Sequence, residues 1–302
     1  MPSQRSLHVD KLLTNVSVQY KNAEYVADRV FPFVPVEKES DLFRVYQRNF
    51  RLPETRRANN AEAREHSFDI STSSYILKRH ALKDYISDDD AMNYDMGSLR
   101  SDTVEELTDK ILLRLESDVA GMFTSTSWSL NTSLSAAQQW SGDTVTSNPI
   151  PLFDTAATSV LRNSGFMPNI GIMPYESMIA AKNHQSVLER LKYTTAESND
   201  RLLAALFNLP ELLVPKASID TSQKGQAESI SALWGDNCFV GYRAPNPSPR
   251  RPSAGYIFRR AKSYVKRYRV EERESEAIEA QMQFDAKVVA SLAGYLLKDS
   301  LA

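Results

Sequence analysis

Residues 101–124 constrain the fold more than any other stretch of this sequence. Their apolar side chains recur every three or four positions, which is the spacing of one face of an α-helix. These side chains are Val104, Leu107, Ile111, Leu115, Val119 and Met122, and Leu112 widens the face. Asp102 with Glu105, or Thr103 with Glu106, predicts a capping pair at the start. At 1.5 Å per residue the helix would be roughly 30–35 Å long, the width of a small domain.

The length and composition are those of an ordinary soluble protein. A chain of 302 residues can fold as one large domain or as two smaller ones, each with a proper core. The sequence is 42% hydrophobic and 25% charged, and its net charge of −2 does not indicate a protein that coats nucleic acid. The single cysteine, Cys238, excludes an internal disulfide framework and fits a reducing compartment.

Neither a secretion signal nor a membrane span is visible. Residues 1–15 lack the apolar core that a signal peptide needs. No apolar run approaches the ~18–20 residues that cross a bilayer. We therefore expect a soluble intracellular protein without a membrane partner.

The segment 30–36 is apolar and is predicted to be extended. Pro32 and Pro35 forbid a helix interior there. Phe31 and Phe33 are its largest side chains, and apolar side chains on an extended path need a surface to cover. Either the chain's own core or a neighbouring chain could supply that surface, and we take Phe31 and Phe33 as candidate inter-subunit contacts.

Residues 40–73 predict a long two-stranded excursion with a polar tip at 53–63. Side chains alternate in character from Leu42 onward and again between His66 and Ile70, which is a strand pattern. An isolated hairpin is only marginally stable in water, so such an arm usually lies on another surface. Its acidic residues are balanced by six arginines, namely Arg44, Arg48, Arg51, Arg56, Arg57 and Arg64. Mixed charge favours another protein surface over a nucleic-acid groove, so we predict these arginines to be inter-subunit contacts; an ordinary solvated loop is the alternative.

The remaining chain alternates between strands and helices. Residues 75–86 predict a strand, and the three aspartates at 88–90 predict a turn near a helix start, since their spacing lacks the calcium-loop pattern. A mixed α/β block follows, with helices near 151–162, 174–182, 184–192 and 199–207 and strands at 169–173, 212–215 and 232–242. Strands return at 255–258, 264–272, 276–284 and 287–297.

No motif for catalysis, metal or nucleotide binding is present. The sequence contains no GxGxxG, GxxxxGK[ST], GxSxG or HExxH pattern. The four histidines lie far apart in dissimilar segments, and Cys238 has no CxxC partner and sits in an apolar strand. We predict no catalytic residue, no metal ligand and no cofactor, although catalytic groups distant in sequence can still assemble in a fold.

Several patches spread over nearly the whole chain share one resemblance. They are residues 25–36, 78–88, Trp140 with Pro149, 169–174, 236–242, 252–258 and 288–297. In this order they are similar to the major capsid proteins of tailed bacteriophages, which have the Hong Kong 97 phage-type fold. Arg259 and Arg260 depart from the family's pattern, in which an aromatic residue follows Phe258.

The resemblance implies an α+β chain with the phage major capsid fold, divided into four parts. An N-terminal arm is expected at 1–37 and an extended β-hairpin loop at 38–74. A peripheral domain would comprise 75–149 and 256–302, with its long spine helix at about 101–124. An axial α/β domain at 150–255 would place its loops around five- and six-fold axes.

The resemblance also implies a function. The chain would be a structural subunit, not an enzyme, that self-assembles into pentamers and hexamers and encloses double-stranded DNA without sequence-specific binding. Portal, separate scaffold and decoration proteins would be its partners, and it would reside in the virion capsid after assembly in the host bacterial cytoplasm. Two alternatives stay open: an encapsulin-like compartment shell, and a small-molecule hydrolase or binding domain within residues 150–255.

Overall fold

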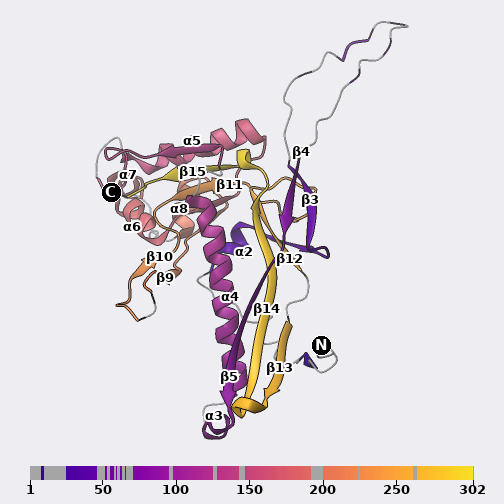
Figure 1. The fold of residues 1–302 in the computed structure, drawn as a ribbon. Coiled ribbons are helices and arrows are strands. Elements are labelled where there is room, and N and C mark those ends of the chain that lie inside the picture. Colours follow the sequence, from indigo (N-terminus) through magenta and orange to yellow (C-terminus); the bar gives the residue numbers. More distant parts are fainter. Residues whose placement is uncertain are drawn as a thin grey trace.

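The chain forms an elongated body in a computed structural model, shown in Figure 1. The structure describes residues 8–9, 25–45, 71–94, 98–124, 128–142, 147–191, 200–223, 225–260 and 264–301. Within the long loop it also describes residues 52, 55–57, 59, 62 and 65.

The spine of the molecule is helix α4, Leu99–Thr124, which confirms the predicted long helix. Five of the predicted apolar side chains are buried, namely Val104, Leu107, Ile111, Leu115 and Val119, whereas Met122 is only partly buried and Phe123 takes the buried position beside it. The predicted capping pairs are wrong because the helix begins earlier: the Asp102 amide already donates to the Ser98 carbonyl at 3.2 Å. The Thr103 hydroxyl, one turn inside the helix, donates to the Leu99 carbonyl at 2.8 Å.

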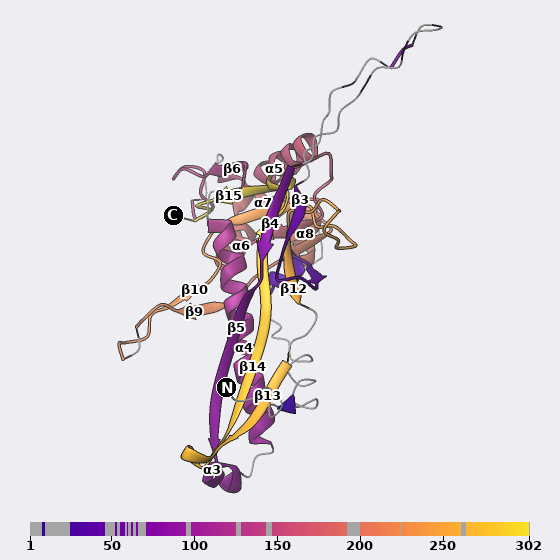
Figure 2. The ribbon, with the colours of Figure 1, turned by 45° about the vertical axis from the view of Figure 1, so that its right-hand side comes forward.

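One side of α4 packs against a long sheet, as Figures 1 and 2 show. The sheet contains β1 (His8–Val9), β2 (Phe33–Val36), β5 (Lys78–Ser87), β12 (Gly255–Arg260), β13 (Tyr264–Val270) and β14 (Ser275–Val288). Strand β14 is its centre and pairs antiparallel with β5, β12 and β13. Strand β2 extends the sheet by pairing in parallel with β12.

The alternation of side chains along β14 explains which face meets the helix. Its apolar members Ile278, Ala280, Met282, Phe284 and Ala286 are buried in one core with the apolar face of α4. The residues between them are mostly polar and lie on the opposite face of the strand. This second face is also covered in part, because Gln281, Gln283 and Asp285 are buried and the Ile76 amide of β4 donates to the Asp285 carboxylate at 3.0 Å.

A second sheet lies beside the upper end of α4 in Figure 1 and carries helices on its faces. Its strand order is β6 (Leu130–Ser133), β15 (Gly294–Lys298), β11 (Cys238–Gly241), β7 (Ile170–Ile172) and β8 (Glu211–Leu213). The helices of this part are α5 (Pro149–Ser164), α6 (Tyr175–Asn183), α7 (Gln185–Leu191) and α8 (Asp200–Leu206). All four were predicted within a few residues, and the α+β class is confirmed.

The strand pairing changes one part of the predicted domain division. Strand β15 lies between β11 and β6, so residues 130–133 and 294–298 share a sheet with the 150–255 block. Both stretches were expected in the peripheral domain. The other domain limits stay predictions.

Two ribbons and several short helices complete the described fold. The ribbons are β3 (Ser40–Val45) with β4 (Ser71–Ile76), and β9 (Ser218–Asp220) with β10 (Ile230–Ala232). The short helices are α2 (Ala27–Val30), α3 (Asp88–Asn93), η3 (Glu271–Arg273) and η4 (Ser291–Ala293). The predicted strand at 232–242 is divided, since β10 and β11 belong to different sheets.

The three aspartates at 88–90 form the first turn of α3 and not only a turn before a helix. The Ser87 hydroxyl caps this helix by accepting from the Asp90 amide at 3.1 Å. Acidic side chains at a helix start are favoured by the helix dipole. Among the described helices, none has the length and apolarity that a membrane span requires.

Candidate inter-subunit surfaces

Phe31 belongs to the core of its own chain. Its side chain is fully buried and its ring centre lies 5.5 Å from that of Phe123 and 6.4 Å from that of Trp128. A Cβ atom added to Gly255 would come within 2.5 Å of the Phe31 ring, so only glycine fits there. The prediction of Phe31 as an inter-subunit contact is therefore corrected. Phe33 is half-buried, and the Arg259 guanidinium lies over its ring, with Cζ 5.1 Å from the ring centre.

A buried carboxylate, Glu116 of α4, joins three parts of the molecule. It accepts hydrogen bonds from the Val26 and Ala27 amides at the start of α2, at 3.1 and 2.8 Å, and from Trp234 Nε1 at 2.8 Å. Burial raises the pKa of Glu116, while these three donors act in the opposite direction. Glu116 thus connects the end of the arm, the spine helix and the segment after β10. Sequence reasoning missed it; the only signal was a charged residue beside the apolar stripe.

A second connection to the arm is made by Glu211 at the start of β8. The Arg29 and Arg243 guanidiniums donate to its two carboxylate oxygens at 2.6 and 2.8 Å. Burial alone would raise the pKa of Glu211, but the two arginines outweigh it and hold that pKa below its ordinary value. Arg243 also donates to the Arg29 carbonyl at 2.5 Å, which holds α2 against the second sheet.

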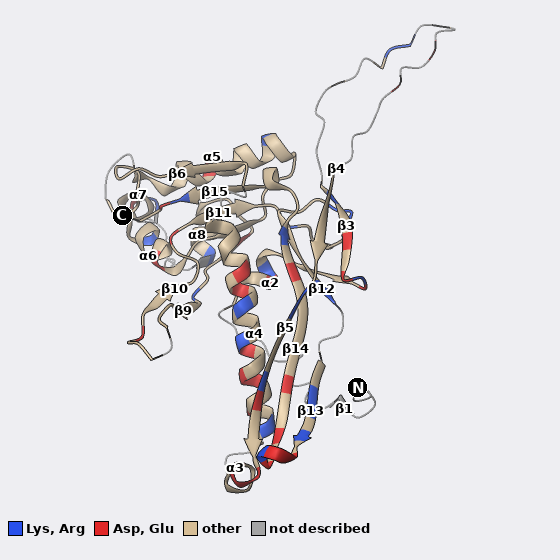
Figure 3. Cartoon of the chain, in the orientation of Figure 1, with Lys and Arg blue, Asp and Glu red and all other residues tan. Residues whose placement is uncertain are grey.

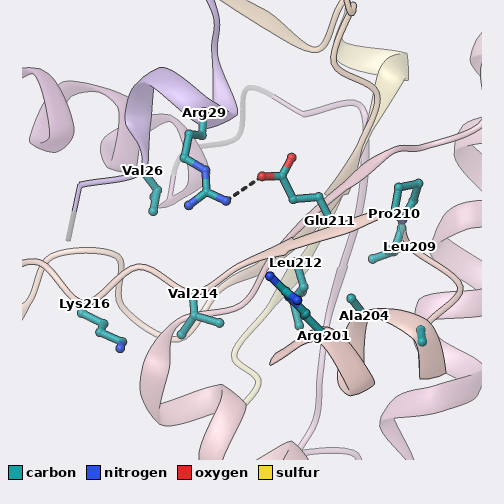
Figure 4. Close-up of a pocket in the computed structure, with 11 residues that line it drawn as sticks. Val26, Arg29, Arg201, Ala204, Leu209, Pro210, Glu211, Leu212, Val214 and Lys216 are labelled. Atoms are coloured by element: carbon teal, nitrogen blue, oxygen red, sulfur yellow. Dashed lines mark hydrogen bonds and ion pairs between the residues drawn. The ribbon is translucent and has the colours of Figure 1, made fainter. Parts of the chain in front are cut away.

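The Arg29–Glu211 pair lines a hollow of about 750 Å³, shown in Figure 4. Its lining includes the apolar side chains of Val26, Leu209 and Leu212 and the basic residues Arg201 and Lys216. Among its described lining residues there is no histidine, cysteine, serine or threonine. The charged groups that line the hollow are Arg29, Arg201, Lys216 and Glu211, and the Glu211 carboxylate is already paired with Arg29 and Arg243.

The base of the extended loop is anchored on the chain itself. Phe43 of β3 and Tyr75 of β4 are buried, and the Tyr75 ring stacks on Phe258 with ring centres 4.5 Å apart. The opposite face of the same ribbon exposes Leu42 and Ile76, at 65% and 62% of their full accessible area. The ribbon therefore has one face in the chain's own core and one face open to a partner.

The six arginines predicted as contacts have different outcomes. Arg44 on β3 and Arg56 and Arg57 at the loop tip are exposed. Arg48, Arg51 and Arg64 lie outside the described residues. The exposed three stay predicted contacts.

Ion pairs, several of them between strands, run along the lower half of the long sheet, where Figure 3 shows alternating basic and acidic segments. Lys266 of β13 lies 3.8 Å from Glu279 of β14, and Arg267 lies 3.1 Å from Glu276. Arg269 forms a two-pronged pair with Asp88 of α3, which lowers the pKa of the Asp88 carboxyl. The basic cluster of β13 is thus occupied by acidic partners.

One serine and one histidine form a buried pair in the second half of the chain. Ser147 Oγ lies 2.8 Å from His184 Nε2, and the Ser186 amide donates to His184 Nδ1 at 3.2 Å. Because Nδ1 accepts, the proton of the neutral ring lies on Nε2 and is donated to Ser147. The Ser147 hydroxyl in turn donates to the Gly142 carbonyl at 2.5 Å. A catalytic pair needs the opposite direction, with the serine donating to an unprotonated nitrogen, so the described hydrogen bonds do not form an activated serine.

The single cysteine lies in a buried position. Burial raises the pKa of Cys238 to about 12, so its thiol does not ionise at neutral pH. Within the described residues, no cluster of three His, Cys, Asp or Glu side chains is arranged to hold a metal ion.

Comparisons with known proteins agree with this geometry. No family model matches the chain. It is 26% identical to the major capsid protein of Burkholderia phage BcepMu over 303 residues, which covers 96% of this chain and 95% of that protein. A phage-related protein from Bordetella bronchiseptica RB50 has a similar structure, with a TM-score of 0.80 at 23% identity over 98% of both chains.

A third similarity decides the fold. The capsid structure of Cyanophage P-SCSP1u matches with a TM-score of 0.62 at 11% identity, over 92% of this chain and 89% of that one. The chain has the phage capsid fold. The capsid fold accounts for the long α4 beside a long sheet, and the predicted resemblance to phage major capsid proteins is confirmed.

Proposed function

We propose that this chain is the structural subunit of an icosahedral bacteriophage head. It assembles into pentamers and hexamers, and these form the shell around the double-stranded DNA genome. The observation that carries the proposal is the match over 96% of the chain to a phage major capsid protein, together with a capsid fold.

The surfaces of the chain support assembly. The β3–β4 ribbon buries Phe43 and Tyr75 on one face and leaves Leu42 and Ile76 on the other. A ribbon with an exposed apolar face is stabilised when a neighbouring molecule covers it. Arg56 and Arg57 lie exposed beyond this ribbon and supply charge for such a contact.

A non-enzymatic role agrees with the described interior. The Ser147–His184 pair has its protons in the wrong arrangement for nucleophilic attack, and the Cys238 thiol is buried and protonated. The alternative of a hydrolase within residues 150–255 therefore has no described catalytic group to support it. The encapsulin-like alternative is not favoured, because the curated relatives are phage major capsid proteins.

Electron microscopy of the purified product tests the proposal. The chain should be expressed alone and together with the genes adjacent to its own, since scaffold, portal and decoration proteins are its proposed partners. We expect closed shells, and co-expression should raise the yield of uniform particles if a separate scaffold sets their size. A monomer that turns over a small substrate would contradict the proposal.

The contents of particles from infected cells separate the two kinds of shell. A phage head holds double-stranded DNA, whereas an encapsulin-like compartment holds a cargo protein. Nuclease-protected DNA in the particles is the expected result. A stoichiometric enzyme in place of DNA would favour the compartment.

A further inference from the structure

The β9–β10 ribbon is a projection that belongs to neither large sheet. Its three backbone pairs join Ser218 to Ala232, Ile219 to Ser231 and Asp220 to Ile230. In both Figure 1 and Figure 2 it leaves the body to the side, away from the β3–β4 ribbon. A two-stranded ribbon is only marginally stable alone, so its attachment and its exposed surface both need an explanation.

The root of the ribbon is fixed to the body. Ala217 and Trp234, which flank the two strands, are buried, and the Leu233 amide donates to the Ala217 carbonyl at 3.0 Å. Trp234 Nε1 donates to the buried Glu116 carboxylate of the spine helix at 2.8 Å. The direction in which the ribbon leaves is therefore set by the spine helix.

The far end of the ribbon is held by its own hydrogen bonds. The Asp220 carboxylate accepts from the Ser222 amide, the Ser222 hydroxyl and the Ser229 amide at 2.9, 2.9 and 3.0 Å. The Thr221 amide donates to the Ser229 carbonyl at 3.0 Å. A projection that is ordered before it binds loses less conformational entropy on binding.

The surface of the ribbon fits a protein partner. All three residues of β10 are exposed, and 69% of the accessible area of Ile230 is exposed. Ile230 and Tyr175 both line a hollow of about 420 Å³. Residues 218–232 contain two acidic residues, Asp220 and Glu228, and one basic residue, Lys224. A surface without excess positive charge does not follow a phosphate backbone, whereas an exposed isoleucine suits an apolar contact.

We propose that the β9–β10 ribbon is a contact between neighbouring copies of this chain in one ring of subunits. The inference rests on the proposed function, because in a closed shell every lateral side of a subunit faces another copy. A ring of identical subunits uses two different surfaces of each, one on either side. The β3–β4 ribbon lies toward one side and the β9–β10 ribbon toward the other, so each copy offers one to each neighbour.

Cysteine labelling at position 230 tests this contact. Cys238 is fully buried with its pKa raised to about 12, so wild-type protein gives little background with a maleimide. The Ile230→Cys thiol should react readily in free subunits and about tenfold more slowly in assembled particles. A tenfold change corresponds to a contact free energy of about 1.4 kcal/mol. Equal rates in subunits and particles would overturn the inference. Failure of the wild-type chain to form particles would instead contradict the proposed function.

A shortened ribbon provides a second test. Residues 221–229 are replaced by Asn-Gly, which can connect Asp220 to Ile230 as a two-residue hairpin turn. The subunit should keep its melting temperature, while the yield of particles should fall about tenfold. Normal particle yield from this variant, with Ile230→Cys still reactive in particles, would show that the ribbon contacts no neighbour.

Discussion

At the scale of single residues, buried polar groups hold the arm to the body. Glu116 receives three donors from two distant segments, and Glu211 receives two guanidiniums. The two carboxyls differ in the direction of their pKa shifts, because burial dominates at Glu116 and the two arginines dominate at Glu211. They should therefore respond to acid in opposite ways.

The stability contributed by Glu116 should increase as the pH falls. Its pKa is raised in the folded state, so the folded chain binds the proton more tightly than the unfolded chain. Lowering the pH from above the folded value toward the unfolded value then favours folding, by at most about 1.4 kcal/mol per pH unit. Urea unfolding of wild type and Glu116→Gln at several pH values measures the difference between them. A wild-type advantage that shrinks between pH 8 and pH 5 would contradict this assignment.

Arg56 and Arg57 should matter for assembly and not for folding. Both are exposed at the loop tip, and exposed substitutions usually change stability by less than about 0.5 kcal/mol. Exposed ion pairs are worth only about 0.2–1 kcal/mol each, but in a shell the contact repeats at every subunit. Replacing both with Glu should block assembly while the thermal melt of the subunit hardly changes. Replacing both with Lys is the matched control and should retain most assembly. A large drop in the melting temperature of the Glu variant would place these residues in the subunit's own core.

At the scale of elements, the base of the extended loop is attached to the body of the chain. Tyr75 and Phe43 attach the β3–β4 ribbon to Phe258 of the long sheet. Among the described residues of the loop, the buried hydrophobic side chains are Phe43 and Tyr75 at its base.

Deleting residues 53–63 should separate folding from assembly. The deletion leaves the β3–β4 pairs and their aromatic contacts in place, so the subunit should stay folded and soluble but no longer form shells. Tyr75→Ala, by contrast, removes a buried ring and should destabilise the subunit by about 3 kcal/mol. Circular dichroism melts and electron microscopy of both variants distinguish the two effects. Normal shells from the deletion variant would contradict the prediction that the loop tip is required for assembly.

At the scale of the whole molecule, acidic and basic side chains are nearly balanced. The chain has 36 Lys and Arg residues against 38 Asp and Glu residues. Figure 3 shows that both signs alternate along α4 and the long sheet. Lys266, Arg267 and Arg269 are each paired with a carboxylate.

Purified subunits should bind duplex DNA weakly at physiological salt. Affinity for DNA depends on the number of cations free to contact phosphates, and much of the basic strand β13 is already paired with carboxylates. A wall that holds DNA yet releases it gains from weak binding. Fluorescence anisotropy with labelled duplex over a range of salt concentrations measures the affinity. A Kd below about 1 μM with a steep salt dependence would overturn this prediction.

The sequence by itself determined most of the regular elements. The helix α4, the four helices of the second half and most strands follow from periodicity, because the pattern of apolar side chains depends only on near neighbours in the chain. The paired charges of β13 and β14 were also visible, since acidic residues follow the basic cluster directly.

Only the tertiary structure decided where these elements meet. It placed Phe31 in the chain's own core, put β15 beside β11, and brought Glu116 to partners 90 and 118 positions away. It also oriented the Ser147–His184 pair so that the serine is not activated. Contacts of this kind join residues far apart in the chain, and local periodicity carries no information about which buried polar group meets which donor.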